Sequence, residues 1–369
     1  MVSGLSIRLH GLTAQALSQQ LMAHLKPLGL DEWAVCEPDD GQGQLRVRLA
    51  SEAFARWCPD HDTLHATQRH PAPFASLEQA VRWELWLAWL AAPIALSFES
   101  WADVMSAERV RCLLSHNARR TSMDFHTEEA TRPPAHWTYH EDTGFTLLPN
   151  QDLVEALILA TQPEISGQVY AFSCYRATEY VVVLSIAQEL KAHHPRLYEA
   201  LQNHWRQKAI MSEDFHATFL VELGSVQQPL PMHWYVPGDR VWFKNPHLPS
   251  TDATGYEGSW VVYLGQGLFC NFWQHTKPYT LEHKCVEIFH WRDGLFIDAQ
   301  GEAQINEDRV NALTDQSLAD PEAKARILSL MQRFRDPMGV YAEGGCMDAT
   351  REVPLKLLPE HCQVNLPAL

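Results

Sequence analysis

Cys174 is the residue of this chain best placed for covalent chemistry. It lies in the stretch YAFSCYRATEYVVV, and the longer run CYRATEYVVVLSIAQELKAHH carries Ala177, Val181 and Leu184 on one helical stripe before it ends in Lys, His and Pro. This pattern favours a helix that starts near Cys174 over a buried strand. Unsatisfied N–H groups at a helix start favour the thiolate, which is the nucleophilic form of cysteine. The alternative is that Cys174 is a buried apolar spacer, since free cysteine is among the most buried residue types.

The rest of the chain predicts helices first and strands afterwards. Ser76 and Gln79 form a capping box ahead of a helix over residues 76–92, and residues 194–210 have amphipathic helical spacing. After residue 230 the stretches PGDRVWF, GSWVVYLGQGLFCNFW and CVEIFHW are rich in β-branched and aromatic residues and are separated by Gly and Pro turns. They predict consecutive antiparallel strands, and a last helix follows over residues 322–334. This order predicts an α+β protein.

The order of these pieces resembles a known architecture. A cysteine at a helix start, a PGD turn into a strand, and the strand VVYLG resemble papain-like NlpC-type peptidases. More specifically, YAFSC, the phrase GDRVWFKNP and VVYLG resemble the spore-type bacterial transglutaminases, which are protein-glutamine γ-glutamyltransferases related to the NlpC-type fold. The similarity covers about residues 135–285. It implies a papain-like core, in which the nucleophile helix packs on an antiparallel sheet, and acyl transfer on protein glutamine at Cys174.

The catalytic partners of the family do not carry over directly. In the family, Ala-Thr follows the cysteine directly, whereas Tyr175 and Arg176 intervene here. The position of the family's catalytic carboxylate, which opens the VVYLG strand, is Ser259 here. The position of its histidine on the next strand falls at about Phe272.

Nearby residues are candidates to replace these partners. Glu257 lies two residues before Ser259, so period-two alternation would put both on one face of a strand. His275 lies just beyond Phe272, the position of the family's histidine. Asn271 is suited to orient an imidazole, as in papain-like enzymes. His216, in the phrase EDFH, is a further candidate base. Glu257 and His275 are the predicted partners of Cys174, although both residue types also occur on solvated surfaces.

The resemblance implies a definite reaction. The thiolate would attack the side-chain amide of a protein glutamine, release ammonia and form a thioester. An amine would resolve it to a crosslink, and water would resolve it to a deamidated residue, with no cofactor or metal required. The partners expected are therefore a protein with an accessible glutamine and an amine or water acceptor. The alternatives are a catalytically inactive relative that acts in binding or assembly, and an NlpC-type amidase or peptidase.

Composition excludes several other classes. The net charge of −16 argues against nucleic-acid binding and against attachment to an anionic membrane. The eight cysteines include no CxxC pair, which is typical of reduced thiols in a chain of 369 residues. The N-terminal residues lack a basic start followed by an apolar core, so a cytoplasmic location is expected, although signal-independent export would leave no trace.

The polar, Pro-rich stretch TEEATRPPAHW predicts a domain boundary near residue 130. The expected parts are an N-terminal α+β domain over residues 1–130, a transglutaminase-like papain-fold domain over 131–315, and a C-terminal helix and tail over 316–369. In the stretch CPDHDTLHATQRH, zinc-compatible side chains lie close together in sequence, namely Cys58, His61, His65 and His70. Their spacing matches no standard zinc module, so no metal ligand is predicted.

Overall fold

The computed structural model describes residues 2–39, 41–124, 130–335, 345–358 and 362–367. Its central feature is a six-stranded antiparallel sheet in the order β13-β12-β11-β10-β16-β9. The strands are β13 (Tyr279–Thr280), β12 (Leu268–Phe269), β11 (Gly258–Gly265), β10 (Arg240–Lys244), β16 (Arg351–Pro354) and β9 (Leu220–Leu223). The strands predicted within PGDRVWF and GSWVVYLGQGLF are therefore confirmed, and so is the α+β class.

The helix α7 (Cys174–His193) begins at the predicted cysteine. It packs against β11 and against two further helices, α4 (Trp101–Arg120) and α5 (Leu153–Thr161). The three consecutive valines at positions 181–183 favour a strand by propensity, yet they are fully buried in the helix. Burial from several sides stabilises this helix, because packing overrides the weak intrinsic preference of its residues. The predicted arrangement, a helix that begins at Cys174 and packs on an antiparallel sheet, is confirmed.

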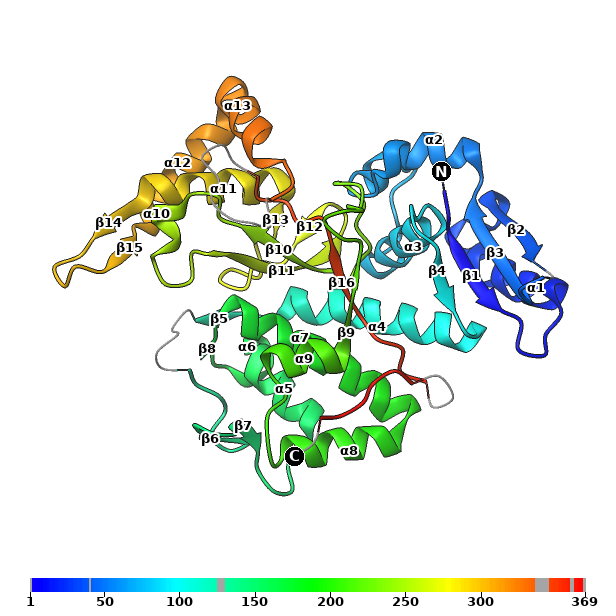
Figure 1. Cartoon of the computed structure of the whole chain (residues 1–369), viewed down its shortest axis with the longest axis horizontal. Coiled ribbons are helices and arrows are strands. Elements are labelled where there is room, and N and C mark those ends of the chain that lie inside the picture. Colours follow the sequence, from blue (N-terminus) through cyan, green and yellow to red (C-terminus); the bar gives the residue numbers. More distant parts are fainter. Residues whose placement is uncertain (1, 40, 125–129, 336–344, 359–361, 368–369) are drawn as a thin grey trace.

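One predicted strand is wrong. Residues 285–291 lie inside the helix α11 (Leu281–Gly294), whose cap Thr280 accepts a hydrogen bond from the His283 N–H group. In Figure 1 the strands β10 and β11 lie between α11 and α4. Two more helices, α12 (Glu307–Ala319) and α13 (Pro321–Met331), pack on α11 from the other side. A helix enclosed in this way has apolar residues on most faces, so its sequence loses the helical period and reads like a buried strand.

The N-terminal part contains a second sheet, of order β2-β3-β1-β4, with its own apolar core. The strands are β1 (Leu5–Arg8), β2 (Ala34–Asp39), β3 (Gln44–Leu49) and β4 (Leu96–Phe98), and the helices are α1 (Ala14–Leu25), α2 (Ser51–Trp57) and α3 (Leu77–Leu90). Helix α3 is capped by Ser76 as predicted. Helix α4 belongs to both cores: Val104 packs into the N-terminal core and Val110 into the larger one.

The remaining elements are short or lie at the edges of the larger part. They are β5 (Met123–Asp124), β6 (Trp137–His140), β7 (Gly144–Leu147), β8 (Tyr170–Ala171), β14 (Leu295–Ile297), β15 (Ala303–Ile305), α6 (Pro163–Ser166), α8 (Pro195–Trp205), α9 (Ser212–Phe219), α10 (Leu248–Thr251) and the 3₁₀ turns η1 (Lys26–Leu28), η2 (Asp31–Trp33), η3 (Pro59–His61) and η4 (Ala66–Arg69). Among the described residues, none of the helices is both long and apolar enough to cross a membrane.

Candidate active site

Cys174 is the first residue of α7, and the local sequence explains why the helix starts there. The preceding residue, Ser173, has an extended backbone, and its hydroxyl accepts a hydrogen bond of 3.2 Å from the Arg176 N–H group. This is an ordinary N-cap, which satisfies one of the donors that a helix start leaves free. The Cys174 residue itself is only 8% exposed. The thiol therefore lies at the N-terminal end of a helix, as predicted, but in a buried setting.

The electrostatic environment of the thiol contains opposing influences. Burial raises the pKa of Cys174 above its usual value, and this influence is the largest. The backbone N–H group of Trp260 on β11 lowers the pKa, and so do the charge of Lys284, the Tyr175 N–H group and the charge of Arg240. The net effect is a raised pKa, which favours the neutral thiol over the thiolate. The helix start and the nearby cations only partly offset the loss of hydration.

An aromatic layer joins the start of α7 to β10 and β11. The indole rings of Trp242 and Trp260 stack at 5.8 Å between centroids, and Tyr175 meets Trp260 edge-on at 5.7 Å. The Arg240 guanidinium lies 3.7 Å from the centroid of the Trp260 ring and donates a hydrogen bond of 2.8 Å to the Thr178 hydroxyl on α7. These contacts hold the cysteine end of the helix against the strand whose N–H group reaches the thiol.

A polar cavity of about 110 Å³ lies between the start of β11 and helix α11. Its lining includes Ser259, Tyr279, Lys284 and Glu287. The Ser259 hydroxyl is buried and has no hydrogen-bond partner among the described residues. The Lys284 ammonium group, with a side chain only 1% exposed, donates a hydrogen bond of 2.9 Å to Glu287. It also lies 3.9 Å from the centroid of the Tyr279 ring. The cavity therefore holds a buried cation whose charge acts on Cys174.

The two predicted catalytic partners lie apart from the thiol's direct contacts. Glu257 is exposed, just before β11 begins, and within the described residues its side chain makes no hydrogen bond or ion pair. His275 lies in the loop after β12, with its Nε2 atom 3.4 Å from a carboxylate oxygen of Glu164. No interaction of the described residues joins either side chain to Cys174. Their assignment as partners of the thiol therefore stays a prediction.

The two further candidates have evident structural roles. The side-chain carbonyl oxygen of Asn271 accepts hydrogen bonds of 3.1 Å from the N–H groups of Trp273 and Gln274. Its side-chain amide nitrogen donates to the Lys277 carbonyl, so Asn271 shapes the loop after β12. His216 lies in α9 and pairs with Glu352 at 3.3 Å.

The sequence interpretation missed Lys284 and Glu287. Glu287 lies in the stretch taken for a strand, and Lys284 directly precedes it. In an extended chain the two side chains would point to opposite faces, whereas on α11 they are neighbours. The usable signal was the capping residue Thr280 ahead of an i, i+3 pair of opposite charges.

The structure thus has a cysteine at a helix start, with that helix packed against an antiparallel sheet. The chain belongs to the protein-glutamine gamma-glutamyltransferase family, whose family model matches residues 62–343. Among solved structures, the chain is similar to a transglutaminase from Geobacillus stearothermophilus without its C-terminal extension, with 16% identity and a TM-score of 0.39 over 58% of this chain and 97% of that chain. No curated protein sequence matches significantly. The predicted family is confirmed.

Proposed function

We propose that the protein is a cysteine-dependent acyltransferase that acts on glutamine side chains of proteins through a thioester at Cys174. The observation that carries the proposal is the position of this thiol. Cys174 is the first residue of α7, and both the Trp260 N–H group and the charge of the buried Lys284 lower its pKa. Membership of the protein-glutamine gamma-glutamyltransferase family supports the same reaction.

The reaction would run in two steps. The Cys174 thiol gives its proton to a base, and the sulfur forms a bond to the glutamine amide carbon. The carbon–nitrogen bond then breaks, and the nitrogen leaves as ammonia after taking up a proton. A primary amine or water attacks the thioester, which frees the thiol and yields a crosslinked or deamidated residue. The N–H groups of Cys174 and Tyr175, at the start of α7, are suited to stabilise the negative oxygen of both tetrahedral intermediates.

More than one residue is a candidate for the base that accepts the thiol proton. Lys284 favours the thiolate through its charge, and Glu287 places a carboxylate in the same cavity. We propose Glu287 as a third candidate base beside Glu257 and His275. A carboxylate can serve in this role when it reaches the proton directly or through one water molecule.

Ammonia release from a glutamine-rich protein, with and without a primary amine, tests the reaction. Wild type is expected to release ammonia, and Cys174→Ala is expected to release none. Glu257→Gln, His275→Gln and Glu287→Gln should then separate the candidate bases, because only the loss of the true base lowers turnover by about 100-fold or more. Labelling with a thiol-reactive glutamine analogue, followed by peptide mapping, must mark Cys174. A label on another cysteine would overturn the assignment.

A second function, binding without catalysis, is favoured by two observations. Ser259 replaces the family's carboxylate and leaves its hydroxyl unpaired within the described residues, and Cys174 is buried with a raised pKa. On this proposal the family fold is retained for assembly. Wild type would then release no ammonia, and no analogue would label Cys174, although the protein folds normally.

A further inference from the structure

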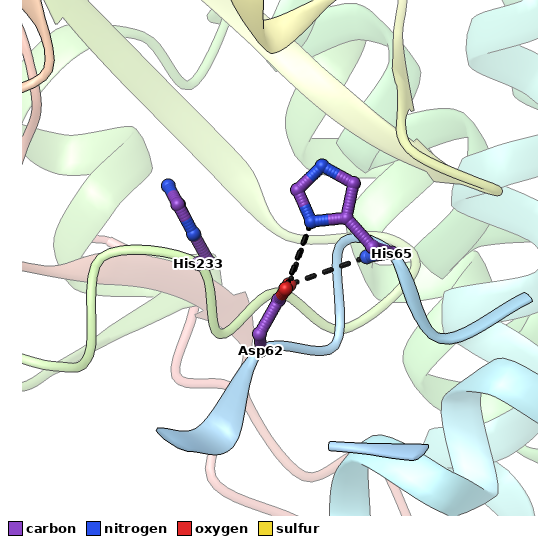
Figure 2. Close-up of side chains that lie close together, drawn as sticks. All are labelled: Asp62, His65 and His233. Carbon is purple, nitrogen blue, oxygen red and sulfur yellow. Dashed lines mark hydrogen bonds and ion pairs between the residues drawn. The ribbon is translucent and has the colours of Figure 1, made fainter. Parts of the chain in front are cut away.

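A cluster of metal-binding side chains lies away from the thiol, where the N-terminal part meets the chain ahead of β10. Asp62, His65 and His233 each offer one ligand atom, and these atoms all lie within 4.8 Å of one another. Figure 2 shows Asp62 and His65 on one loop, joined by hydrogen bonds, and His233 beside them on another loop. Among the described residues this is the only group of three or more such side chains. Of the zinc-compatible residues that lie close together in sequence, only His65 belongs to this cluster, and Cys58, His61 and His70 do not.

The backbone holds these three side chains in register. The N–H groups of Thr63 and Leu64 both donate hydrogen bonds of 3.1 Å to the His233 carbonyl. The Thr63 hydroxyl donates to the Tyr235 carbonyl at 2.6 Å and accepts from the Tyr235 N–H group at 2.8 Å. These hydrogen bonds join the two loops at the residues beside the cluster. Ligands that are preorganised in this way lose little conformational entropy on binding.

The distances between the ligand atoms of His65 and Asp62 suit a bound metal ion in place of the hydrogen bond between them. The His65 Nδ1 atom lies 2.8 Å and 3.1 Å from the two carboxylate oxygens of Asp62. Zinc binds imidazole nitrogen and carboxylate oxygen at about 2.0–2.2 Å. Two ligand atoms of a tetrahedral zinc ion therefore stand only a few tenths of an ångström farther apart than the His65 nitrogen and the Asp62 oxygens do here. The third ligand atom is a ring nitrogen of His233, which lies within 4.8 Å of the ligand atoms of the other two residues.

We propose that Asp62, His65 and His233 bind one divalent transition-metal ion of the Zn²⁺ class. Two imidazoles and one carboxylate form a donor set that zinc accepts, with a fourth position for water. Binding replaces the hydrogen bond between His65 and Asp62: the metal takes the Nδ1 atom, and the neutral imidazole then carries its proton on Nε2. The His65 side chain is 40% exposed, which provides an entry path. The ion would fasten the loop after η3 to the loop ahead of β10, and this role does not depend on catalysis at Cys174.

Arg69 is the residue that competes with the metal. Its guanidinium pairs with an Asp62 carboxylate oxygen at 2.5 Å and also donates to the carbonyl groups of Trp57 and Asp62 at 3.0 Å. The positive charge disfavours a cation beside it, whereas the hydrogen bonds between Asp62 and His65 do not involve Arg69. We therefore expect Arg69→Gln to retain the site and to bind zinc several-fold more tightly than wild type.

Isothermal titration of chelator-treated protein with ZnCl₂ tests the proposal. Wild type should bind one equivalent of zinc per chain, and the melting temperature should rise with zinc. His65→Gln and His233→Gln should each weaken binding by at least about 100-fold, beyond the effect of losing a residue that only supports a ligand. His70→Gln is the matched control: this histidine stacks on Phe74 and bonds the Ala72 carbonyl, so binding should not change.

Cobalt(II) absorption separates this site from binding by thiols. The cobalt-loaded protein should show visible bands of a low-coordinate ion without the near-ultraviolet charge-transfer band of a cobalt–thiolate bond. Absence of a zinc equivalent in wild type would overturn the proposal. So would equal zinc affinity in folded His65→Gln and His233→Gln variants, or a thiolate band that survives in them.

Discussion

At the scale of single residues, the buried charge of Lys284 acts on the pKa of two cysteines. Burial raises the pKa of Cys174 and raises that of Cys270 to about 12, and in each case the Lys284 ammonium group lowers it again in part. A cation this deeply buried needs a compensating charge, which Glu287 supplies at 2.9 Å. The reactivity of the cysteine therefore depends on a residue that lies on a different helix.

The first prediction concerns Lys284→Met, which keeps the shape of the side chain and removes the charge. The pKa of Cys174 should rise further, because an opposing influence is lost, so alkylation of this thiol should be several-fold slower at pH 8 and should require a higher pH. Iodoacetamide labelling across pH 7–10, with peptide mapping of Cys174, measures this. Lys284→Arg keeps the charge and is the control. Identical labelling profiles for the Met and Arg variants would contradict the prediction.

The second prediction concerns the unpaired hydroxyl of Ser259. A buried hydroxyl without a partner costs free energy, so Ser259→Ala should leave the free energy of unfolding unchanged or raise it by up to about 1 kcal/mol. Ser250 is the matched control, since it is fully buried and its hydroxyl bonds Asn245 at 2.8 Å and the His247 carbonyl at 3.0 Å. Ser250→Ala should lower the free energy of unfolding by about 1–3 kcal/mol. Urea unfolding of both variants makes the comparison, and equal losses would refute it.

At the scale of elements, helix α3 is joined to the turn between β11 and β12 by Glu84. This carboxyl group is fully buried, and it accepts hydrogen bonds from the Tyr263 hydroxyl and, at 2.5 Å, from the Gln266 N–H group. Burial raises its pKa from 4.5 to about 7, against the lowering effect of these hydrogen bonds and of Arg119. Glu84 therefore changes its charge within the physiological range of pH.

This shift predicts a pH-dependent stability. The folded state holds the Glu84 proton more tightly than the unfolded state, so the stabilisation is complete below pH 4.5 and is lost as pH rises through about 7. The loss is on the order of 3 kcal/mol. Glu84→Gln cannot ionise, so its free energy of unfolding relative to wild type should rise by that amount from pH 4.5 to pH 8. Urea unfolding at several pH values measures it, and a constant difference would rule it out.

At the scale of the whole molecule, α4 links the two apolar cores. Its Arg111 side chain forms an ion pair of 2.8 Å with Asp239, and both side chains are buried. Its Ser115 hydroxyl bonds the Leu264 carbonyl of β11 at 2.7 Å. The helix that precedes the predicted boundary near residue 130 thus packs against the sheet that follows it. The division of the chain at that boundary stays a prediction.

A truncation tests how independent the two parts are. A fragment over residues 131–369 lacks α3 and α4, which leaves Asp239 buried without its arginine and uncovers one side of β11. Loss of one partner of a buried ion pair costs about 3–5 kcal/mol, so this fragment should not fold cooperatively. Circular dichroism and urea unfolding of the fragment check this against the full chain. A sharp transition like that of the full chain would show that residues 131–369 form a domain of their own.

The sequence by itself determined the features that depend on neighbours along the chain. The start of α7 at Cys174, the Ser76 cap and the strands β10 and β11 each follow from residues within a few positions of one another. The same local phrases carried the family resemblance, which the family model confirms. Caps and alternating strands are readable from sequence because their hydrogen bonds and side-chain periods are local.

Only the tertiary structure decided which distant side chains meet. Helix α11 was mistaken for a strand because burial on several sides removes the period that distinguishes the two. The neighbourhood of Lys284 and Cys174 depends on how α11 and α7 pack around β11, and Thr63 meets His233 across 170 residues of chain. Such meetings arise from the packing of whole elements, and residue spacing carries no record of them. The helix start at Cys174 could therefore be predicted from the sequence, whereas the charged neighbours of this residue on other elements could not.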